Sequence, residues 1–569
     1  MPLLHQEKMK TASLLLSLAL ALATMAADAA ERSDRQLLDM ASMVLHTSAK
    51  KAPAVGSTSG NDLSILYEKG GMVVVGGNDR GFAVLSRDNQ FKAVLGYSGC
   101  NFNASDINPN MQWWMDCTMA AMATGYDKRM SAIIPEGLPT EVESFVTTHW
   151  AQDAPYNSLC PSYTSGTTTK QYPSGCVATA MSQAMNYYKY PEHGTTTRLY
   201  RFNPGTGEQI TQKVVLDDIM FDWDNMLDEY NSGSYTDEQG KAVGELMLAC
   251  GAAVEMEYTP SGSGAIGAQS CYALRTYFGY DPGISYYFKD GITNQEFQNI
   301  IFTTLGNRKP VVFDGQSTSG GHAFVLDGYD AEGNVHVNWG WGKRGGDGYF
   351  DIAIMNGFSS GQGCYPVSMD GTYATPMSMF TIYQGSLAIN KVDNTHVKVT
   401  TDGRLLNIAC DTYKGNIYLV AENTATNEKT AIATEQISMS VMSLYFATSG
   451  GISKPFVTIK NKIGDGDYRL YLASKSDTEK DYSPVRTTDE MTNSYLMTVA
   501  EGVITSVEPE SDAAWMVGTT GINGITMDNA GGNLAPTYYS ISGQRLSSPS
   551  SGNIVILKQG KNVRKVMAQ

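Results

Sequence analysis

The chain has 569 residues, a formal net charge of −16 and 42% hydrophobic residues. Hydrophobic content near the globular average argues against wholesale disorder, and the length suggests about four folded units. Lys and Arg do not cluster, so the acidic balance argues against nucleic-acid binding, because phosphate contacts need such clusters.

Residues 1–29 have the pattern of a secretory signal peptide. Lys8 and Lys10 form a basic start, an apolar stretch follows at 11–25, and Ala-Asp-Ala at 27–29 supplies a small-x-small cleavage site. The apolar stretch is too short for a membrane anchor. We therefore expect a protein that is secreted or held at the cell surface.

Residues 30–142 carry short elements that predict a small α+β unit. The expected elements are helices at 37–45 and 110–122 and strands at 72–75, 82–85 and 94–98. Gly-Gly-Asn-Asp at 76–79 favours a hairpin between the first two strands. Two prolines and a glycine at 133–139 indicate an extended connector at the end of this unit.

The rest of the chain divides into segments that differ in amino-acid composition and in the pattern of apolar residues. Residues 143–385 are dense in aromatic residues and glycine, whereas 386–507 alternate apolar and polar residues with turns about every ten positions, which predicts an Ig-like β-sandwich. A Gly-, Asn- and Ser-rich stretch at 508–533 indicates a linker, and 534–569 form a final short β module.

The eight cysteines are far apart and form neither a dense disulfide framework nor a Cys-x-x-Cys pair. We therefore expect no metal site and no cofactor. Cys176 differs from the rest because apolar residues at helical spacing follow it through 188, with Ser174 as the expected N-cap. A cysteine in the first turn of a helix is favoured as thiolate by the helix dipole and free N–H groups, which is how a nucleophile is made. From this stretch alone, a buried structural cysteine is equally consistent.

A thiolate nucleophile needs a histidine, and His322 follows Gly-Gly at the start of a predicted strand. A second strand at 335–338 is expected to pair with it and to bring Asn338 beside the imidazole, with Trp339 shielding that hydrogen bond from water. His336 shares a face with Asn338, and we interpret it as a packed strand histidine rather than the base.

Three motifs resemble the streptopain family of secreted cysteine endopeptidases, which also contains interpain. They are Gly-Cys-Val-Ala-Thr-Ala at 175–180, Gly-His-Ala-Phe-Val at 321–325 and His-Val-Asn-Trp-Gly-Trp-Gly at 336–342. Residues 150–157 resemble the opening of the mature family enzymes, and 251–265 resemble their substrate-cleft loop. The Lys-Arg-Gly-Gly-Asp run at 343–347 is longer and more charged than the family's usual glycine link.

The resemblance implies an α+β protein with a papain-like catalytic domain of two subdomains at 143–385, an inhibitory propeptide at 30–142, and C-terminal β-sandwich-type domains. It implies that Gln152 supplies an oxyanion donor together with the Cys176 backbone N–H. It also implies the substrate-binding residues Ser261, Gly262, Ser263, Gly264, Gly321 and Trp341. Residues 538–546 and 552–561 resemble C-terminal sorting modules of type IX secretion substrates, although a plain β-hairpin would have a similar pattern.

These patterns predict a secreted cysteine endopeptidase made as a zymogen, in which Cys176 attacks the peptide carbonyl and His322 transfers the protons. The expected partners are protein and peptide substrates, the protein's own propeptide, and the secretion machinery through the C-terminal module. Two alternatives are a transglutaminase-like acyltransferase using the same Cys and His, and an inactive protease scaffold acting as an adhesin.

Overall fold

A computed structural model of the chain describes residues 31–49, 63–124, 132–204, 208–231, 233–260, 262–289, 294–317, 320–342, 345–352, 362–372, 382–383, 387–401, 404–407, 412–440, 444–446, 454–476, 481–485, 492–510, 537–539, 545–546, 554–559 and 562–567. The expected signal peptide, Ser261, the Lys-Arg pair at 343–344 and most of the expected linker lie outside the described residues. The chain forms two compact units, Met1–Thr520 and Gly521–Gln569.

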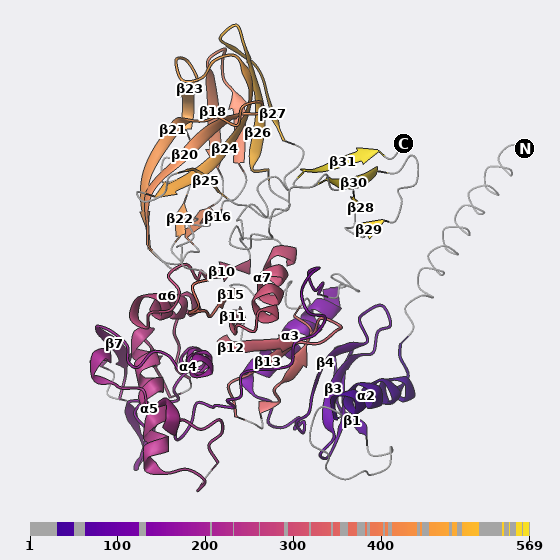
Figure 1. The fold of residues 1–569 in the computed structure, drawn as a ribbon, viewed down its shortest axis with the longest axis vertical. Helices are drawn as coiled ribbons and strands as arrows, with labels where there is room; N and C mark the ends of the chain where they lie inside the picture. Colours follow the sequence, from indigo (N-terminus) through magenta and orange to yellow (C-terminus); the bar gives the residue numbers. More distant parts are fainter. Residues whose placement is uncertain are drawn as a thin grey trace, which may run out of the picture. The chain divides into compact units, whose positions relative to one another are not determined.

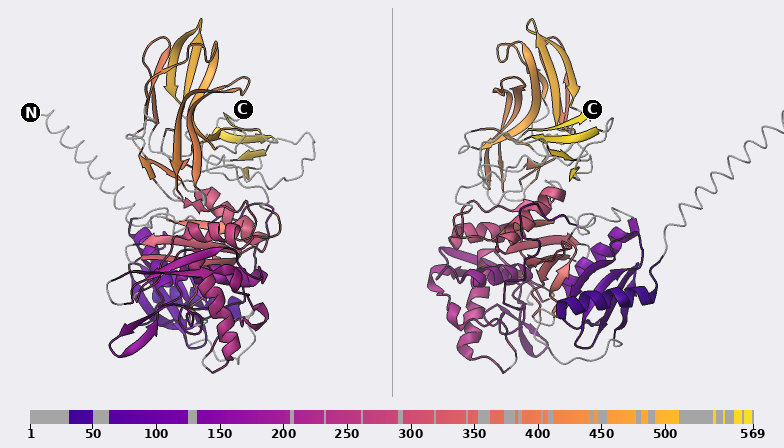
Figure 2. Two further views of the ribbon diagram at one scale, coloured as in Figure 1. Left: turned by 90° about the vertical axis from the view of Figure 1, so that its left-hand side faces the viewer. Right: turned by 45° about the vertical axis from the view of Figure 1, so that its right-hand side comes forward.

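The N-terminal part of the first unit is a helix packed on a four-stranded antiparallel meander, followed by a second helix (Figures 1 and 2). Leu37, Ala41 and Leu45 recur at helical spacing and are buried against the strands. The elements are α2 (Asp34–Ala49), β1 (Ser64–Lys69), β2 (Met72–Gly77), β3 (Gly81–Ser86), β4 (Val94–Ser98) and α3 (Pro109–Thr124).

The central part has a helical half and a sheet half. The helical half holds β5 (Ser162–Ser165), β6 (Thr168–Gln171), α4 (Cys176–Tyr188), β7 (Thr197–Phe202), β8 (Ile210–Val215), the 3-10 turns Leu216–Asp218 and Trp223–Asn225, α5 (Asp237–Ala253), β9 (Glu257–Tyr258) and α6 (Gly267–Tyr277). The sheet half holds β10 (Tyr287–Phe288), α7 (Asn294–Gly306), β11 (Val311–Ser317), β12 (Gly320–Tyr329), β13 (Val335–Asn338), β14 (Gly348–Phe350) and β15 (Gly363–Pro366).

One ten-stranded sheet joins the N-terminal meander to the sheet half, in the order β1-β2-β3-β4-β14-β13-β12-β11-β15-β10. The junction is the antiparallel pair β4–β14, in which Tyr97 lies opposite Tyr349 and their rings stack. The small α+β unit predicted at 30–142 thus continues into the sheet of the central part. Edge strands β4 and β14 satisfy each other's backbone groups, so the two parts share one sheet.

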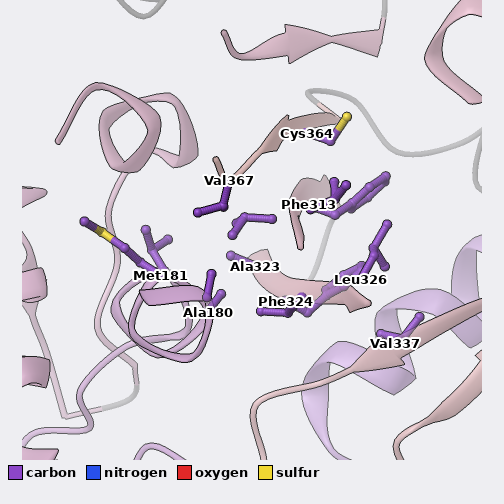
Figure 3. Packing of buried hydrophobic residues seen from close by; sticks show 14 of the residues in the cluster. Ala180, Met181, Phe313, Ala323, Phe324, Leu326, Val337, Cys364 and Val367 are labelled. Carbon is purple, nitrogen blue, oxygen red and sulfur yellow. The ribbon is translucent and has the colours of Figure 1, made fainter. Parts of the chain in front are cut away.

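Strand β12 is covered on both faces because its side chains alternate. Ala323 faces Ala180 and Met181 of α4, as Figure 3 shows. Phe324 points the other way, stacks on Phe313 of β11 and contacts Trp113 of α3. Helix α3 of the N-terminal part and helix α4 therefore pack on opposite faces of the strand that carries His322.

The remaining strands of the first unit form a sandwich-type region with its own core of apolar side chains, among them Val397, Leu419 and Leu470. Its strands lie in three sheets, β16-β19-β22, β17-β18-β23, and β21-β20-β24-β26-β27 with β25 on β24. They are β16 (Ile382–Tyr383), β17 (Leu387–Lys391), β18 (His396–Thr401), β19 (Arg404–Asn407), β20 (Tyr413–Asn423), β21 (Lys429–Met439), β22 (Leu444–Phe446), β23 (Lys454–Thr458), β24 (Gly466–Ser476), β25 (Ser483–Pro484), β26 (Ser494–Ala500) and β27 (Val503–Pro509).

The second unit contains one sheet in the order β29-β28-β30-β31. Its strands are β28 (Thr537–Tyr539), β29 (Arg545–Leu546), β30 (Ile554–Gln559) and β31 (Asn562–Met567). Across the described ranges of both units, no helix combines the length and apolar character that crossing a membrane requires.

Candidate active site

Cys176 is the first residue of α4, and a glycine sets its position. Gly175 precedes it with φ +90°, and a Cβ there would lie 2.8 Å from Met256 and 2.9 Å from the Ser263 carbonyl oxygen. A side chain at 175 would therefore strain the backbone and clash. The expected N-cap, Ser174, is wrong, because Gly175 holds the cap position and Ser174 Oγ lies 3.2 Å from Thr179 Oγ1 instead.

His322 lies in β12 opposite Gly315 of β11 and is half-buried. The backbone of the next residue, Ala323, lies close enough to the Cys176 thiol to lower its pKa, and the backbone of Val177 acts on the thiol in the same direction. The structure thus brings the start of α4 and the start of β12 together, as the sequence predicts. The two residues chosen as nucleophile and general acid–base come from the two halves of the domain.

Burial disfavours the charged form of both groups in this conformation. Burial raises the pKa of the Cys176 thiol, although the N–H groups of Ala323 and Val177 lower it. Burial also lowers the pKa of His322. The depressed thiol pKa expected from the helix start is therefore wrong for the intact chain, because desolvation outweighs the helix terminus.

Gln152 is 7% exposed and lies beside the segment that leads into Cys176. Its backbone oxygen accepts a hydrogen bond from the Ser174 N–H at 3.0 Å. Gln152, the predicted oxyanion donor, is thus hydrogen-bonded to Ser174, which lies two positions before Cys176 in the chain.

Asn338 does not lie where the sequence predicts. Its cross-strand partner is Val325, and alternation puts Val325 and His322 on opposite faces of β12. Asn338 Nδ2 donates to the Thr148 carbonyl at 2.6 Å, and its amide exchanges hydrogen bonds of 3.1 Å with Gln183. Within the described part of the chain, no side-chain hydrogen bond joins Asn338 to His322. The prediction that Asn338 orients the His322 imidazole is therefore wrong for this conformation.

Gln183 is a polar residue that sequence reasoning missed. It lies fully buried on α4, seven positions after Cys176, and its Oε1 accepts hydrogen bonds from the Trp150 N–H and the Thr148 hydroxyl, both at 3.1 Å. A glutamine at a buried position of an otherwise apolar helix is the signal that could have revealed it. Gln183 and Asn338 together form hydrogen bonds with Thr148 and Trp150, which hold the segment before Gln152 against helix α4.

The two tryptophans after Asn338 differ in exposure. Trp339 is fully buried between Phe324 and Phe350, and its backbone N–H donates to Asp347 Oδ1 at 2.8 Å. Trp341 is half-buried, consistent with a position at the surface of a cleft. Trp339 therefore serves the core behind the site and does not cover a His322–Asn338 hydrogen bond.

His336 is anchored in a buried pair. Its Nδ1 contacts the Asp327 carboxylate, whose other oxygen accepts the N–H groups of Phe145 and Val146 at 2.9 and 2.8 Å. Asp327 raises the pKa of His336 against the effect of its burial. These contacts fit the interpretation of His336 as a packed strand histidine.

The loop expected to bind substrate lies directly against the start of α4. Ser263 Oγ donates to the Pro173 carbonyl at 2.7 Å, and Gly264 pairs with Glu257 in an antiparallel bridge. A cavity of about 520 Å³ opens there, lined by Arg201, Glu255, Glu257, Thr259, Gly262, Gly264, Ala265, Ile266 and Gln269. Gly321, the other expected contact, is exposed at the start of β12.

Helix α3 of the N-terminal part reaches the His322 strand from the opposite face. Asn110 is fully buried, and its Nδ2 donates to the carbonyls of Ala323 at 3.2 Å and Trp339 at 2.8 Å. Trp113 packs so closely on β11 that a Cβ at Gly315, the partner of His322, would lie 2.7 Å from its ring. The N-terminal part thus contacts the backbone at the residue after His322 and at the residue after Asn338.

A cysteine at a helix start, a histidine on the facing sheet and an N-terminal part packed against that sheet define a papain-like cysteine peptidase with its prodomain attached. The Peptidase C10 family profile matches residues 150–350. A prointerpain A fragment from Prevotella intermedia, a Cys-to-Ala mutant, has 35% sequence identity and a TM-score of 0.50, and the match covers 56% of this chain and all of that fragment.

Two curated relatives support the same family assignment. Streptopain of Streptococcus pyogenes is 28% identical over 354 residues, 58% of this chain and 87% of streptopain. The thiol protease/hemagglutinin PrtT of Porphyromonas gingivalis is 30% identical over 315 residues, 52% of this chain but only 35% of PrtT. The chain belongs to the Peptidase C10 family, the streptopain family, and the predicted α+β fold class is confirmed.

Proposed function

We propose that the chain is the zymogen of a cysteine endopeptidase in which Cys176 is the nucleophile and His322 the general acid and base. The observation that carries the assignment is that the backbone of Ala323, the residue after His322, acts on the Cys176 thiol at the start of α4 and lowers its pKa. Backbone donors around a sulfur at a helix start stabilise a thiolate once the site is hydrated. The relatives are proteases, which does not favour the acyltransferase or adhesin alternatives.

The proposed reaction proceeds in two steps. The Cys176 thiolate adds to the peptide carbonyl carbon, the Cys176 N–H and the Gln152 side-chain amide hold the resulting oxyanion, and the His322 imidazolium protonates the leaving amine. Water then attacks the thioester, His322 accepts one proton of that water, and the carboxylic acid product leaves as Cys176 returns to the thiolate beside protonated His322. Trp341 and the loop 262–264 provide walls for the substrate in this proposal.

We assign residues 30–142 the role of inhibitory propeptide. The supports are the shared sheet, the hydrogen bonds of Asn110 and the uncharged state of Cys176 and His322 in the intact chain. Removal of α3 would free the Ala323 and Trp339 carbonyls and hydrate the site, so the pair could ionise. We expect cleavage between about residues 125 and 148, around the connector at 133–139 and upstream of Trp150 and Gln152.

Export by the signal peptide at 1–29 and type IX secretion through 534–569 remain proposals that rest on sequence. Their support is the basic-apolar-small pattern at the start and the resemblance of 538–546 and 552–561 to sorting modules. Deletion of 534–569 should leave peptidase activity intact and trap the protein inside a host that has this secretion system.

Incubation of the purified full chain with an unfolded protein tests the activity. We expect peptide fragments with wild type, no fragments with Cys176→Ala, and accumulation of that variant with residues 31–140 still attached. Amine incorporation without fragments would instead identify an acyltransferase. Wild type that cleaves substrate at full rate while keeping residues 31–140 would disprove the zymogen assignment.

A further inference from the structure

Residues 142–152 form a segment that crosses from the sheet half of the central part to the helical half. The segment starts along β12, where its first residue and Tyr329 exchange two backbone hydrogen bonds of 2.8 Å. It ends on the helical half, where the Gln152 backbone oxygen accepts the Ser174 N–H. The position of Gln152 relative to His322 therefore depends on the contacts that hold this crossing segment.

His149 joins the crossing segment to the sheet half. Its Nδ1 donates a hydrogen bond of 3.0 Å to Asp347 Oδ2, and Asp347 directly precedes β14, which pairs with β13. The other carboxylate oxygen, Oδ1, accepts the backbone N–H of Trp339 at 2.8 Å. On the helical side, the His149 backbone N–H donates to the Asp228 carbonyl oxygen at 2.8 Å. His149 thus connects the two halves three residues before Gln152.

The loop that carries Asp347 also has contacts that only the unprocessed chain can make. The Ser98 hydroxyl of β4 donates to the Asp347 backbone oxygen at 2.6 Å, and the side chain of Asn108, directly before α3, donates to the Gly345 carbonyl. Removal of the prodomain breaks both hydrogen bonds. His149 follows the expected cleavage region, so its hydrogen bond to Asp347 remains. We therefore expect the contribution of His149 to be largest in the processed enzyme.

The pair is partly open to water, so its charge can change with pH. The His149 side chain is 34% exposed and that of Asp347 is 6% exposed. The hydrogen bond to Asp347 raises the pKa of His149 against the effect of burial; Glu229 of the helical half adds to the increase, and His336 of β13 opposes it. A hydrogen bond between an imidazolium and a carboxylate is stronger than one from the neutral ring, so protonation strengthens the connection.

We propose that His149 is a positioning residue of the peptidase: bonded to Asp347, it ties the crossing segment to the sheet half and thereby fixes the Gln152 side-chain amide relative to His322. This proposal rests on the endopeptidase function and on the oxyanion role of Gln152 proposed above. The oxyanion forms only during the reaction, so a displaced amide lowers kcat and leaves KM nearly unchanged.

A purely structural role of His149 would have a different signature. If the side chain only stabilised the fold, its loss would lower the fraction of folded enzyme and leave the rate per active site unchanged. Rates are therefore expressed per active site, counted by stoichiometric alkylation of Cys176 in the processed full-chain protein.

Hydrolysis of a peptide substrate provides the first measurement. His149→Ala should lower kcat by about 10- to 100-fold with little change in KM, because a displacement of about 1 Å has an effect of this size. His149→Asn places a neutral N–H donor near the position of Nδ1 and should recover most of that loss. Thr147→Ala is the matched control and should keep kcat, because it removes a hydrogen bond of the same segment to Asp228 on the helical side.

The dependence on pH has a definite sign. Because the pKa of His149 is raised, its imidazolium is present at low pH and is lost as the pH rises through that value, whereas His149→Asn stays neutral. Ionisation of Cys176 and His322 is common to both proteins and cancels in a ratio. The kcat of wild type over that of His149→Asn should therefore fall between about pH 6 and 8.5.

A double-mutant cycle links His149 to the oxyanion donor. Because the tie acts through Gln152, adding His149→Ala to Gln152→Ala should lower kcat by less than about threefold further. Asp347→Asn, which keeps an acceptor for the Trp339 N–H, should lower kcat as His149→Ala does, and it decides the question if the His149 variants do not fold.

Four results would overturn the proposal: multiplicative losses in the cycle, an unchanged kcat per active site in His149→Ala, an equal loss in Thr147→Ala, or a wild-type to His149→Asn ratio that stays flat or rises with pH. Absence of hydrolysis by wild type would count against the endopeptidase function itself. Hydrolysis that Gln152→Ala leaves unchanged would instead count against the roles of Gln152 and His149 and leave the endopeptidase function standing.

Discussion

Asn110 Nδ2 donates a hydrogen bond of 2.8 Å to the carbonyl oxygen of Trp339, which joins the N-terminal helix α3 to the residue directly after Asn338. The same amide also donates to the carbonyl of Ala323, the residue after His322. The buried Asn110 side chain therefore hydrogen-bonds helix α3 to strand β12 and to the residue that follows β13.

Replacing Asn110 by Ala should therefore weaken inhibition. Loss of two buried hydrogen bonds costs about 1–3 kcal/mol, which corresponds to roughly 5- to 150-fold in the equilibrium between the closed and released prodomain. Self-processing of the full chain should accelerate accordingly when followed by gel electrophoresis. Gln112→Ala on the same helix is the control, because that side chain bonds Asp116 at the exposed surface. Equal processing rates in the two variants would show that Asn110 carries no inhibition.

Thiol alkylation should report the charge state of the site. Because burial raises the Cys176 thiol pKa in the intact chain, iodoacetamide at about pH 6 should label Cys176 of the unprocessed His322→Ala protein slowly. After processing, wild-type Cys176 should react faster than Cys250, which is buried in the catalytic domain and whose rate serves as an internal reference. Mass spectrometry of labelled peptides measures both rates. Fast labelling of Cys176 before processing would contradict the uncharged pair.

The sequence predicts the start of α4, the β12–β13 hairpin and the position of His322 because these depend on local patterns: helical spacing, paired glycines and alternation. It does not predict where Asn338 points. That depends on a pairing register between strands, and a register that places Val325 opposite Asn338 turns its amide toward Gln183. Asn110 and Gln183 also escape prediction, since each acquires its role from contacts with segments far away in the chain.

Asn338→Ala should reduce the stability of the intact chain more than it reduces catalysis by the processed enzyme. The substitution leaves Gln183 and the Thr148 carbonyl without their buried partner, at a cost of about 1–3 kcal/mol per unsatisfied group. For a domain of this size, each kcal/mol lowers Tm by about 2–4 °C, which circular dichroism can follow. Gln183→Ala should have a similar effect, and the double variant should lose less than the sum of both. A strictly additive loss would show that the two side chains act independently.

The His336–Asp327 pair should make stability depend on pH. Since the pKa of His336 is raised in the folded protein, its protonated form contributes stability that is fully present below the ordinary histidine pKa of about 6.5 and is lost as the pH rises through the folded value. The unfolding free energy of wild type relative to His336→Gln should therefore decline from pH 6 to pH 8. His149 also has a raised pKa beside Asp347, but it is common to both proteins and cancels in the difference. His193→Gln, which removes a partly exposed ring, is the control, and urea unfolding of the processed and unprocessed proteins is the measurement. A difference in unfolding free energy that increases with pH would mean that the fold stabilises the neutral imidazole of His336.

Peptidase assays of the same variants test the choice of catalytic base. Loss of activity in His336→Gln together with full activity in His322→Ala would reverse that choice.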